Sequence, residues 1–171
     1  DYTVQDNRIK KLYELGKELN WNVEVDVDWS RPFETLTEPT PIFWDDYAPY
    51  QKFSDDKKVE FLNHRIAWSQ SQFLHGEQGA LLVASQLTSC APTYNAKLYA
   101  ASQTFDEARH VEAFNKYIQT RTKLMYPIGN ALKSILDKIL TDPRWDLKFI
   151  GMQIIIEGLA LAAFQTSREL T

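Results

Sequence analysis

The chain has 171 residues, a net charge of −4 and a sequence pI of about 5.4, with 44% hydrophobic and 25% charged residues. This composition is close to that of an average soluble globular protein and gives no support to a fibrous or disordered chain, and the acidic balance argues against a nucleic-acid partner, which requires a basic surface. The single cysteine, Cys90, excludes an internal disulfide and a thiolate metal cluster within the chain, so a cytoplasmic protein is expected.

Residues 1–53 predict a short helix followed by an aromatic arm. Apolar residues recur at helical spacing between Gln5 and Asn20, which is typical of an amphipathic helix. From Trp21 to Phe53 this period is absent, and prolines and aromatic residues are frequent. A free linker would be more polar, so we expect the arm to pack on a surface. The aromatic residues of the arm are Trp21, Trp29, Phe33, Phe43, Trp44, Tyr47, Tyr50 and Phe53.

Long helices are expected from residue 54 to the end of the chain. Ser54 is a suitable N-cap for the first of them, and Pro92, Pro127 and Pro143 each suit the first turn of a later one. The expected ranges are about 54–88, 92–122, 127–140 and 143–171. No strand alternation of useful length occurs, so the prediction is a single all-α domain over residues 1–171.

The last helix contains the longest apolar run, from Gly151 to Phe164. This run is too short to span a bilayer and includes Gln153 and Glu157, so no membrane contact is expected. Because the run is apolar nearly all round, it predicts a buried helix with Glu157 in its middle. A buried carboxylate requires a cation, a hydrogen-bonded partner or a proton. Glu157 is therefore either a metal ligand or the partner of an Arg or Lys on a neighbouring helix.

Two further helices carry candidate ligands. Glu107 and His110 stand three positions apart, so they project from one helix face and can share a metal ion. Glu-x-x-His also arises by chance as a solvated pair, so the motif alone is weak. Glu77 lies among small and apolar residues, and its neighbours Gly76 and Gly79 indicate close approach of another helix or space beside the acid. An exposed glutamate on a glycine-softened helix remains the alternative for Glu77.

Together, Gly76-Glu77 and Asp106-Glu107-Ala108-Arg109-His110 resemble the ferritin-like di-iron carboxylate superfamily. Within it, they look like the hydroxylase subunit of bacterial multicomponent monooxygenases and ribonucleotide-reductase-small-subunit-like proteins. The resemblance covers roughly residues 60–164. It implies a ferritin-like four-helix bundle with a di-iron centre, in which two helices give one Glu each and two give Glu-x-x-His.

The resemblance also implies a role for each candidate residue. Glu107 would bridge two irons, His110 and Glu77 would bind one of them, and Glu157 would bind the other. Asp106 and Arg109 would support the ligands, the Asp holding the ring of a second histidine, although ordinary surface charges are the alternative. Thr104, one turn before Glu107, would orient oxygen or relay a proton. The neighbouring apolar residues would line a substrate cavity or serve as ordinary core.

The chain departs from the family pattern because it contains no second Glu-x-x-His. We therefore expect that the last ligand helix is missing and lies beyond Thr171, or that the site is completed differently. Glu60 and His64 are too far from Glu77 along the helix to bind the same metal. The chain opens Asp-Tyr-Thr-Val without a methionine, which suggests a processed start.

The expected function is that of an O2-dependent, non-haem di-iron oxidoreductase of the monooxygenase type, acting on a largely apolar small molecule. N-oxygenation and desaturation are variants of this chemistry. Its expected partners are an electron-donor reductase or ferredoxin and a second copy in a homodimer. A radical-generating subunit is disfavoured because Phe114 stands where that family places its radical tyrosine. The competing functions are a ferritin-like iron-binding or storage protein and a metal-free structural bundle.

Overall fold

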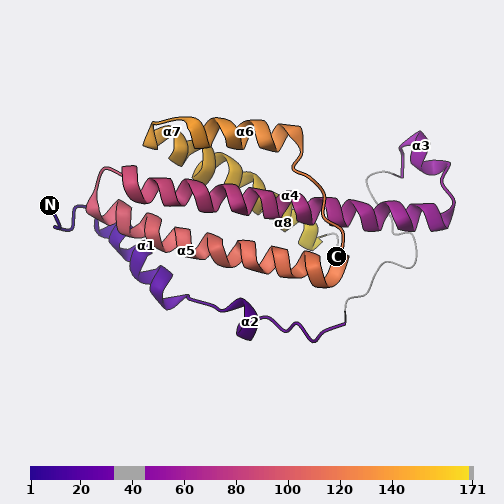
Figure 1. Cartoon of the computed structure of the whole chain (residues 1–171), viewed down its shortest axis with the longest axis horizontal. Helices are drawn as coiled ribbons and strands as arrows, with labels where there is room; N and C mark the ends of the chain where they lie inside the picture. Colours follow the sequence, from indigo (N-terminus) through magenta and orange to yellow (C-terminus); the bar gives the residue numbers. More distant parts are fainter. Residues whose placement is uncertain (33–44, 170–171) are drawn as a thin grey trace.

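The computed structural model describes residues 1–32 and 45–169, and their regular structure is helical throughout (Figure 1). The all-α prediction is confirmed for these residues. The aromatic arm includes Phe33, Phe43 and Trp44, which lie outside the described residues.

The N-terminal helix forms where its apolar spacing predicts it. Helix α1 spans Asn7–Glu18, and the Asp6 carboxylate caps it by accepting from the backbone N–H of Arg8 at 2.8 Å. The arm after it contains two single-turn helices, α2 (Val23–Asp26) and α3 (Ala48–Gln51). Within the arm, Val23 and Tyr50 are buried, as expected for a segment that packs on a surface.

Two long antiparallel helices lie side by side and form the frame of the molecule (Figure 1). Helix α4 spans Asp55–Cys90 and starts at the predicted cap, Ser54. Helix α5 spans Tyr94–Tyr117 and is capped by Thr93, whose hydroxyl accepts from the N–H of Ala96 at 3.2 Å. A π-helical turn, η1 (Ile118–Thr122), continues α5 and ends at Lys123, which has a left-handed φ of 54°.

The C-terminal helices cover α4. Helix α6 (Asn130–Thr141) packs on α4, while α7 (Trp145–Phe149), the π-helix η2 (Ile150–Ile156) and α8 (Glu157–Glu169) follow as one stretch that passes behind α4 (Figure 1). The predicted starts of α6 and α7 are two to three residues early, because Pro127 and Pro143 precede the first helical turn rather than occupying it. The π-helix was not predicted, since a single inserted residue leaves no mark on an apolar run.

The hydrophobic core lies between α4, α5, α6 and η2. Small residues on α4 and α5 let the helices approach, and larger ones from α6 and η2 fill the space between them. The core residues are Ala80, Val83, Leu87, Ala100, Leu136, Ile139 and Met152. Lys148 is also buried, and its ammonium donates to the carbonyl oxygens of Ile139 and Leu140 at 3.0 Å and to Gln86 at 2.6 Å. The buried charge thus supports the C-terminal end of α6.

Gly79 permits the close packing of α6 on α4. A Cβ at this position would lie 2.7 Å from Leu136 Cδ2, whereas a Cβ at Gly76 would meet nothing within 4 Å. Replacing Gly79 by valine should lower the free energy of unfolding by about 1–3 kcal/mol through overpacking. The matched variant Gly76→Val adds the same side chain to the same helix without the clash. Denaturant unfolding of both variants tests this, and equal losses would contradict it.

The prediction of a buried last helix is wrong for much of its surface. Among the residues that the structure describes, no element covers one side of η2 and α8, so large apolar residues there stay exposed. Their exposed fractions are Ile150 44%, Ile154 58%, Ile155 51%, Leu159 63%, Leu161 69% and Phe164 40%.

The continuous helix that contains the predicted apolar run is longer than the run itself. Because α7, η2 and α8 run on without a break, the stretch Trp145–Thr166 has 22 residues and contains an 18-residue window with a mean hydropathy of 1.7, which is long and apolar enough to cross a membrane. Length and composition are the only grounds for this, and they apply equally to a helix that packs on protein. Solubility therefore stays a prediction.

Candidate metal centre

Three of the four predicted ligands converge between α4 and α5. His110 Nδ1 lies 3.2 Å from Glu77 Oε2 and 3.1 Å from Glu107 Oε2. One potential ligand atom from each residue lies within 4.8 Å of those of the other two, a spacing that can hold a metal ion. Below, Glu77, Glu107 and His110 are called the acid–histidine cluster.

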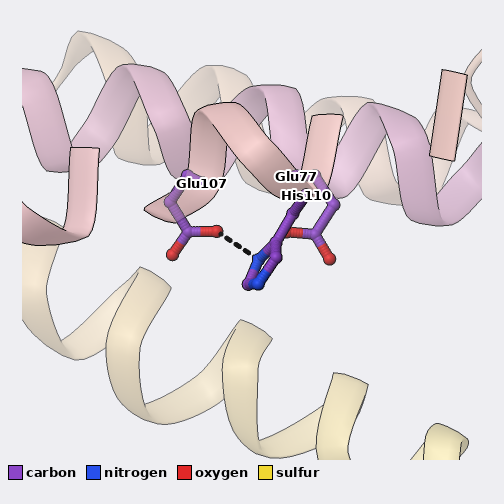
Figure 2. Close-up of side chains that lie close together, drawn as sticks. All are labelled: Glu77, Glu107 and His110. Atoms are coloured by element: carbon purple, nitrogen blue, oxygen red, sulfur yellow. Dashed lines mark hydrogen bonds and ion pairs between the residues drawn. The ribbon is translucent and has the colours of Figure 1, made fainter. Parts of the chain in front are cut away.

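The helix geometry explains why these side chains meet. Glu107 and His110 are three positions apart on α5 and share one face, while Glu77 stands opposite them on the antiparallel α4. Figure 2 shows the imidazole between the two carboxylates, with all three side chains directed toward the C-terminal helix. Glu107 is buried, whereas Glu77 and His110 are partly buried.

In the described part of the chain, His110 is the basic side chain that pairs with the acids of the cluster. Among the described residues, no lysine or arginine pairs with Glu77, Glu107 or Glu157. Hydrogen bonds to Glu107 and Glu77 raise the pKa of His110 to about 10. Burial raises the pKa of Glu107, although its hydrogen bond to His110 opposes that shift. Without metal, the imidazolium thus supplies the positive charge that two closely placed acids need.

This protonation predicts how metal affinity depends on pH. Below the His110 pKa of about 10, a metal must displace the proton from the ring. The apparent affinity for Fe(II) should therefore rise with pH, by about tenfold per unit for each proton released. Anaerobic competition with a coloured chelator between about pH 7 and pH 9 measures the slope. Because Glu157 has a pKa of about 7, the variant Glu157→Gln removes its proton from the measured slope and leaves that of His110. An Fe(II) affinity independent of pH would contradict the prediction.

The raised pKa of His110 also predicts that the stability of the metal-free fold falls as the pH rises. Since folding raises the His110 pKa from 6.5 to about 10, the protonated ring stabilises the fold fully below about pH 6.5. That contribution is lost as the pH rises through about 10. Metal binding and metal-free stability should therefore respond to pH in opposite directions.

Glu157 lies near the cluster but is not part of it. It is half-buried at the start of α8, and its carboxylate lies outside the set of ligand atoms within 4.8 Å of one another. Burial, with the charges of Glu107 and Glu77, raises its pKa to about 7. The carboxylate is thus within electrostatic reach of both acids. Its assignment to a second metal stays a prediction, and no Arg or Lys pairing of the kind considered as its alternative occurs among the described residues.

Asp106 and Arg109 join the cluster to the N-terminal arm. Arg109 donates to Asp106, to the Asn20 side chain and to the Trp21 carbonyl, the last at 3.0 Å. Asp106 Oδ1 also lies 3.9 Å from His110 Nε2. Arg109 is only 7% exposed, so it is not an ordinary surface charge. Asp106 therefore lies beside the histidine that is present, and its expected contact with a second histidine is untested.

Thr104 occupies the predicted turn before Glu107. Its hydroxyl donates to the Ala100 carbonyl at 2.8 Å and lies 3.5 Å from the Thr88 hydroxyl. The hydroxyl is therefore engaged with its own helix, a common arrangement for threonine inside a helix. Its proposed role with oxygen stays a prediction.

The sequence did not predict the contact of Trp21 with the cluster. The Trp21 ring stacks on His110, with centroids 6.0 Å apart and an interplanar angle of 29°, and the Arg109 guanidinium lies over the same ring at 5.2 Å. These contacts cover His110 on one side. No sequence period could reveal them, because Trp21 belongs to an irregular segment far from His110 in the chain.

A separate pair, Glu60 and His64, lies away from the cluster. His64 Nε2 is 4.0 Å from Glu60 Oε1, and His64 Nδ1 lies 2.5 Å from the Tyr126 hydroxyl. Both members of the pair are exposed on α4, outside the acid–histidine cluster.

Comparisons with protein-family models, curated proteins and solved structures find no match.

Proposed function

We propose that the protein is an O2-dependent di-iron oxidoreductase of the monooxygenase type, built on a ferritin-like four-helix bundle. The observation that carries this proposal is the convergence of two carboxylates and one imidazole, with a further acid nearby and, among the described residues, no lysine or arginine paired with them. Carboxylate and imidazole ligands on facing helices are the donor set of di-iron bundles. Iron bound there would supply the activation of O2.

The chain's own residues would hold and shelter this centre. Glu77, Glu107 and His110 would bind metal, and Glu157 would complete the carboxylate set. Trp21 and the buried Arg109 would fix the His110 ring, since Trp21 stacks on it and Arg109 holds both Trp21 and Asp106. The rings of Phe73, Phe114 and Phe164 stack together, with pairwise centroid distances of 4.7 to 6.4 Å. They would exclude water from one side of the metal centre.

The exposed apolar side of η2 and α8 supports the expectation of a further ligand helix. An element packed there would bury this surface and stand beside Glu157. A reductase or ferredoxin would supply electrons, and homodimer formation remains part of the proposal.

An iron-storage function is the second candidate. It is favoured by the presence of a single histidine in the cluster, because ferritin-like iron sites use one Glu-x-x-His and need no second histidine. The arm packed over His110 argues against it, since a cage-forming subunit has no need of such a cover.

Isotope labelling distinguishes the two. Iron-loaded protein supplied with an electron donor, small apolar substrates and O2 carrying heavy oxygen should give products that contain the label. Mass spectrometry of the products measures this. Conversion of many irons per chain into mineral, with no labelled product, would favour storage. Labelled product should be lost in Glu107→Gln and retained in Glu112→Gln, which changes an exposed acid on the same helix.

A further inference from the structure

A groove of about 500 Å³ lies between α1 and α5 and extends to the acid–histidine cluster. Glu107 is one of its lining residues, so the groove reaches the part of α5 that carries a cluster ligand. Two of its lining residues, Gly16 of α1 and Ser102 of α5, come close together, and a Cβ at Gly16 would lie 3.4 Å from the serine hydroxyl.

Three aromatic residues line the groove. Tyr13 comes from α1, and Tyr99 and Phe105 come from α5. Two of these rings carry a cation: the Lys17 ammonium lies 4.9 Å from the Tyr13 ring centroid, and the Arg109 guanidinium lies 5.0 Å from that of Phe105. Each of these rings packs against a cation of its own helix, and its remaining surface can stack on a flat apolar ligand.

Tyr99 adds a polar group to this wall. Its hydroxyl makes no hydrogen bond to any residue that the structure describes. Burial, followed by the charges of Glu107 and Asp106, raises the pKa of Tyr99, so the phenol keeps its proton at neutral pH. The group is therefore a free hydrogen-bond donor within electrostatic reach of Glu107.

We propose that the groove between α1 and α5 binds a small aromatic compound that carries an oxygen acceptor such as a carbonyl group. Its ring packs on Tyr13 and Phe105, and its acceptor receives a hydrogen bond from the Tyr99 hydroxyl. A volume of about 500 Å³ suits a small molecule better than a peptide or a lipid, and the lining includes the ionisable residues Asp106 and Glu107. That the bound compound is the oxidised substrate rests on the proposed function, whereas its binding does not.

Binding is tested on the metal-free protein with two fluorinated probes. Para-fluoroacetophenone carries the acceptor, and para-fluoroethylbenzene has a similar shape without it. Fluorine NMR titration should show both binding to the wild type. Tyr99→Phe should weaken binding of the ketone by about fivefold to tenfold, the effect of one neutral hydrogen bond, and leave the hydrocarbon unchanged. Tyr117→Phe removes a phenol elsewhere on α5 and should alter neither. Equal effects of Tyr99→Phe on the two probes would overturn the role of the hydroxyl.

A steric variant tests the location. Ser102→Phe fills the groove and should abolish binding of both probes. Ser85→Phe is its matched control, because each serine donates to the carbonyl three residues earlier at 2.7 Å and Ser85 is exposed on α4. Circular dichroism checks that both variants fold. Binding that survives Ser102→Phe in a folded protein would overturn the proposal.

Paramagnetic broadening tests whether a compound bound in the groove lies near iron bound at the acid–histidine cluster. Fe(II) bound anaerobically at the cluster should broaden the fluorine signal of the bound ketone, an effect that Zn(II) should not produce. Binding without such broadening would confirm the groove and contradict its role in substrate delivery. Failure of iron to bind would count against the proposed function while leaving the metal-free titrations as the test of the groove.

Discussion

Replacing His110 by alanine should weaken Fe(II) binding by at least about a hundredfold, since loss of residues that merely support ligands costs tenfold to a hundredfold. His110 is the one nitrogen donor of the cluster, and its Nδ1 lies 3.2 Å and 3.1 Å from the two carboxylates. Without the ring, Glu77 and Glu107 face each other with no imidazolium between them. The pKa of Glu107 should then rise further, and a protonated acid is a poor ligand.

His64→Ala is the control for this variant. His64 is exposed on the same helix as Glu77 but outside the cluster, so its loss should leave iron affinity unchanged. Anaerobic chelator competition measures both variants, and circular dichroism establishes that each is folded. Equal iron affinity in His110→Ala and the wild type would exclude His110 as a ligand.

Glu107→Gln should abolish O2 consumption by the reduced, iron-loaded protein. The change keeps the size of the side chain but removes the charge of the most buried member of the cluster, which is 7% exposed. Glu112→Gln should retain the activity. An oxygen electrode measures uptake after reduction by dithionite is complete and excess reductant has been removed. Undiminished uptake in Glu107→Gln would show that oxygen reacts elsewhere.

The same reaction should leave no stable tyrosyl radical. Phe114 stands at the position of the expected radical tyrosine, and it stacks on Phe73 at 5.7 Å and on Phe164 at 6.4 Å, so no phenol occupies this place. Electron paramagnetic resonance of samples frozen after oxygen exposure tests this. A persistent tyrosyl signal that is lost in Tyr117→Phe would favour a radical-generating subunit over an oxygenase.

Local sequence signals predicted the helices well. Ser54 caps α4 as expected, and Glu107 and His110 share a face because their separation matches the helical period. Gly79 marks the close approach of another helix, which the structure identifies as α6 through Leu136. Each of these predictions depends on neighbours within a few turns of one helix.

Features that depend on distant contacts were missed or misjudged. Trp21 reaches His110 from an irregular arm, and the groove beside Tyr99 exists only because α1 crosses α5. The π-helix η2 precedes Glu157 and alters the direction of the residues that follow, so helical spacing alone could not place this acid. Burial of the last helix was overestimated because apolar composition does not reveal whether another element covers it.

Anomalous diffraction at the iron edge, from crystals of the iron-loaded protein, tests the central claim most directly. An iron peak should lie within coordination distance of His110 Nδ1 and of carboxylate oxygens of Glu77 and Glu107, with a second peak beside Glu157. A map without iron at these residues, or with His110 still hydrogen-bonded to both glutamates in protein that holds iron elsewhere, would contradict the assignment of this cluster as a metal centre.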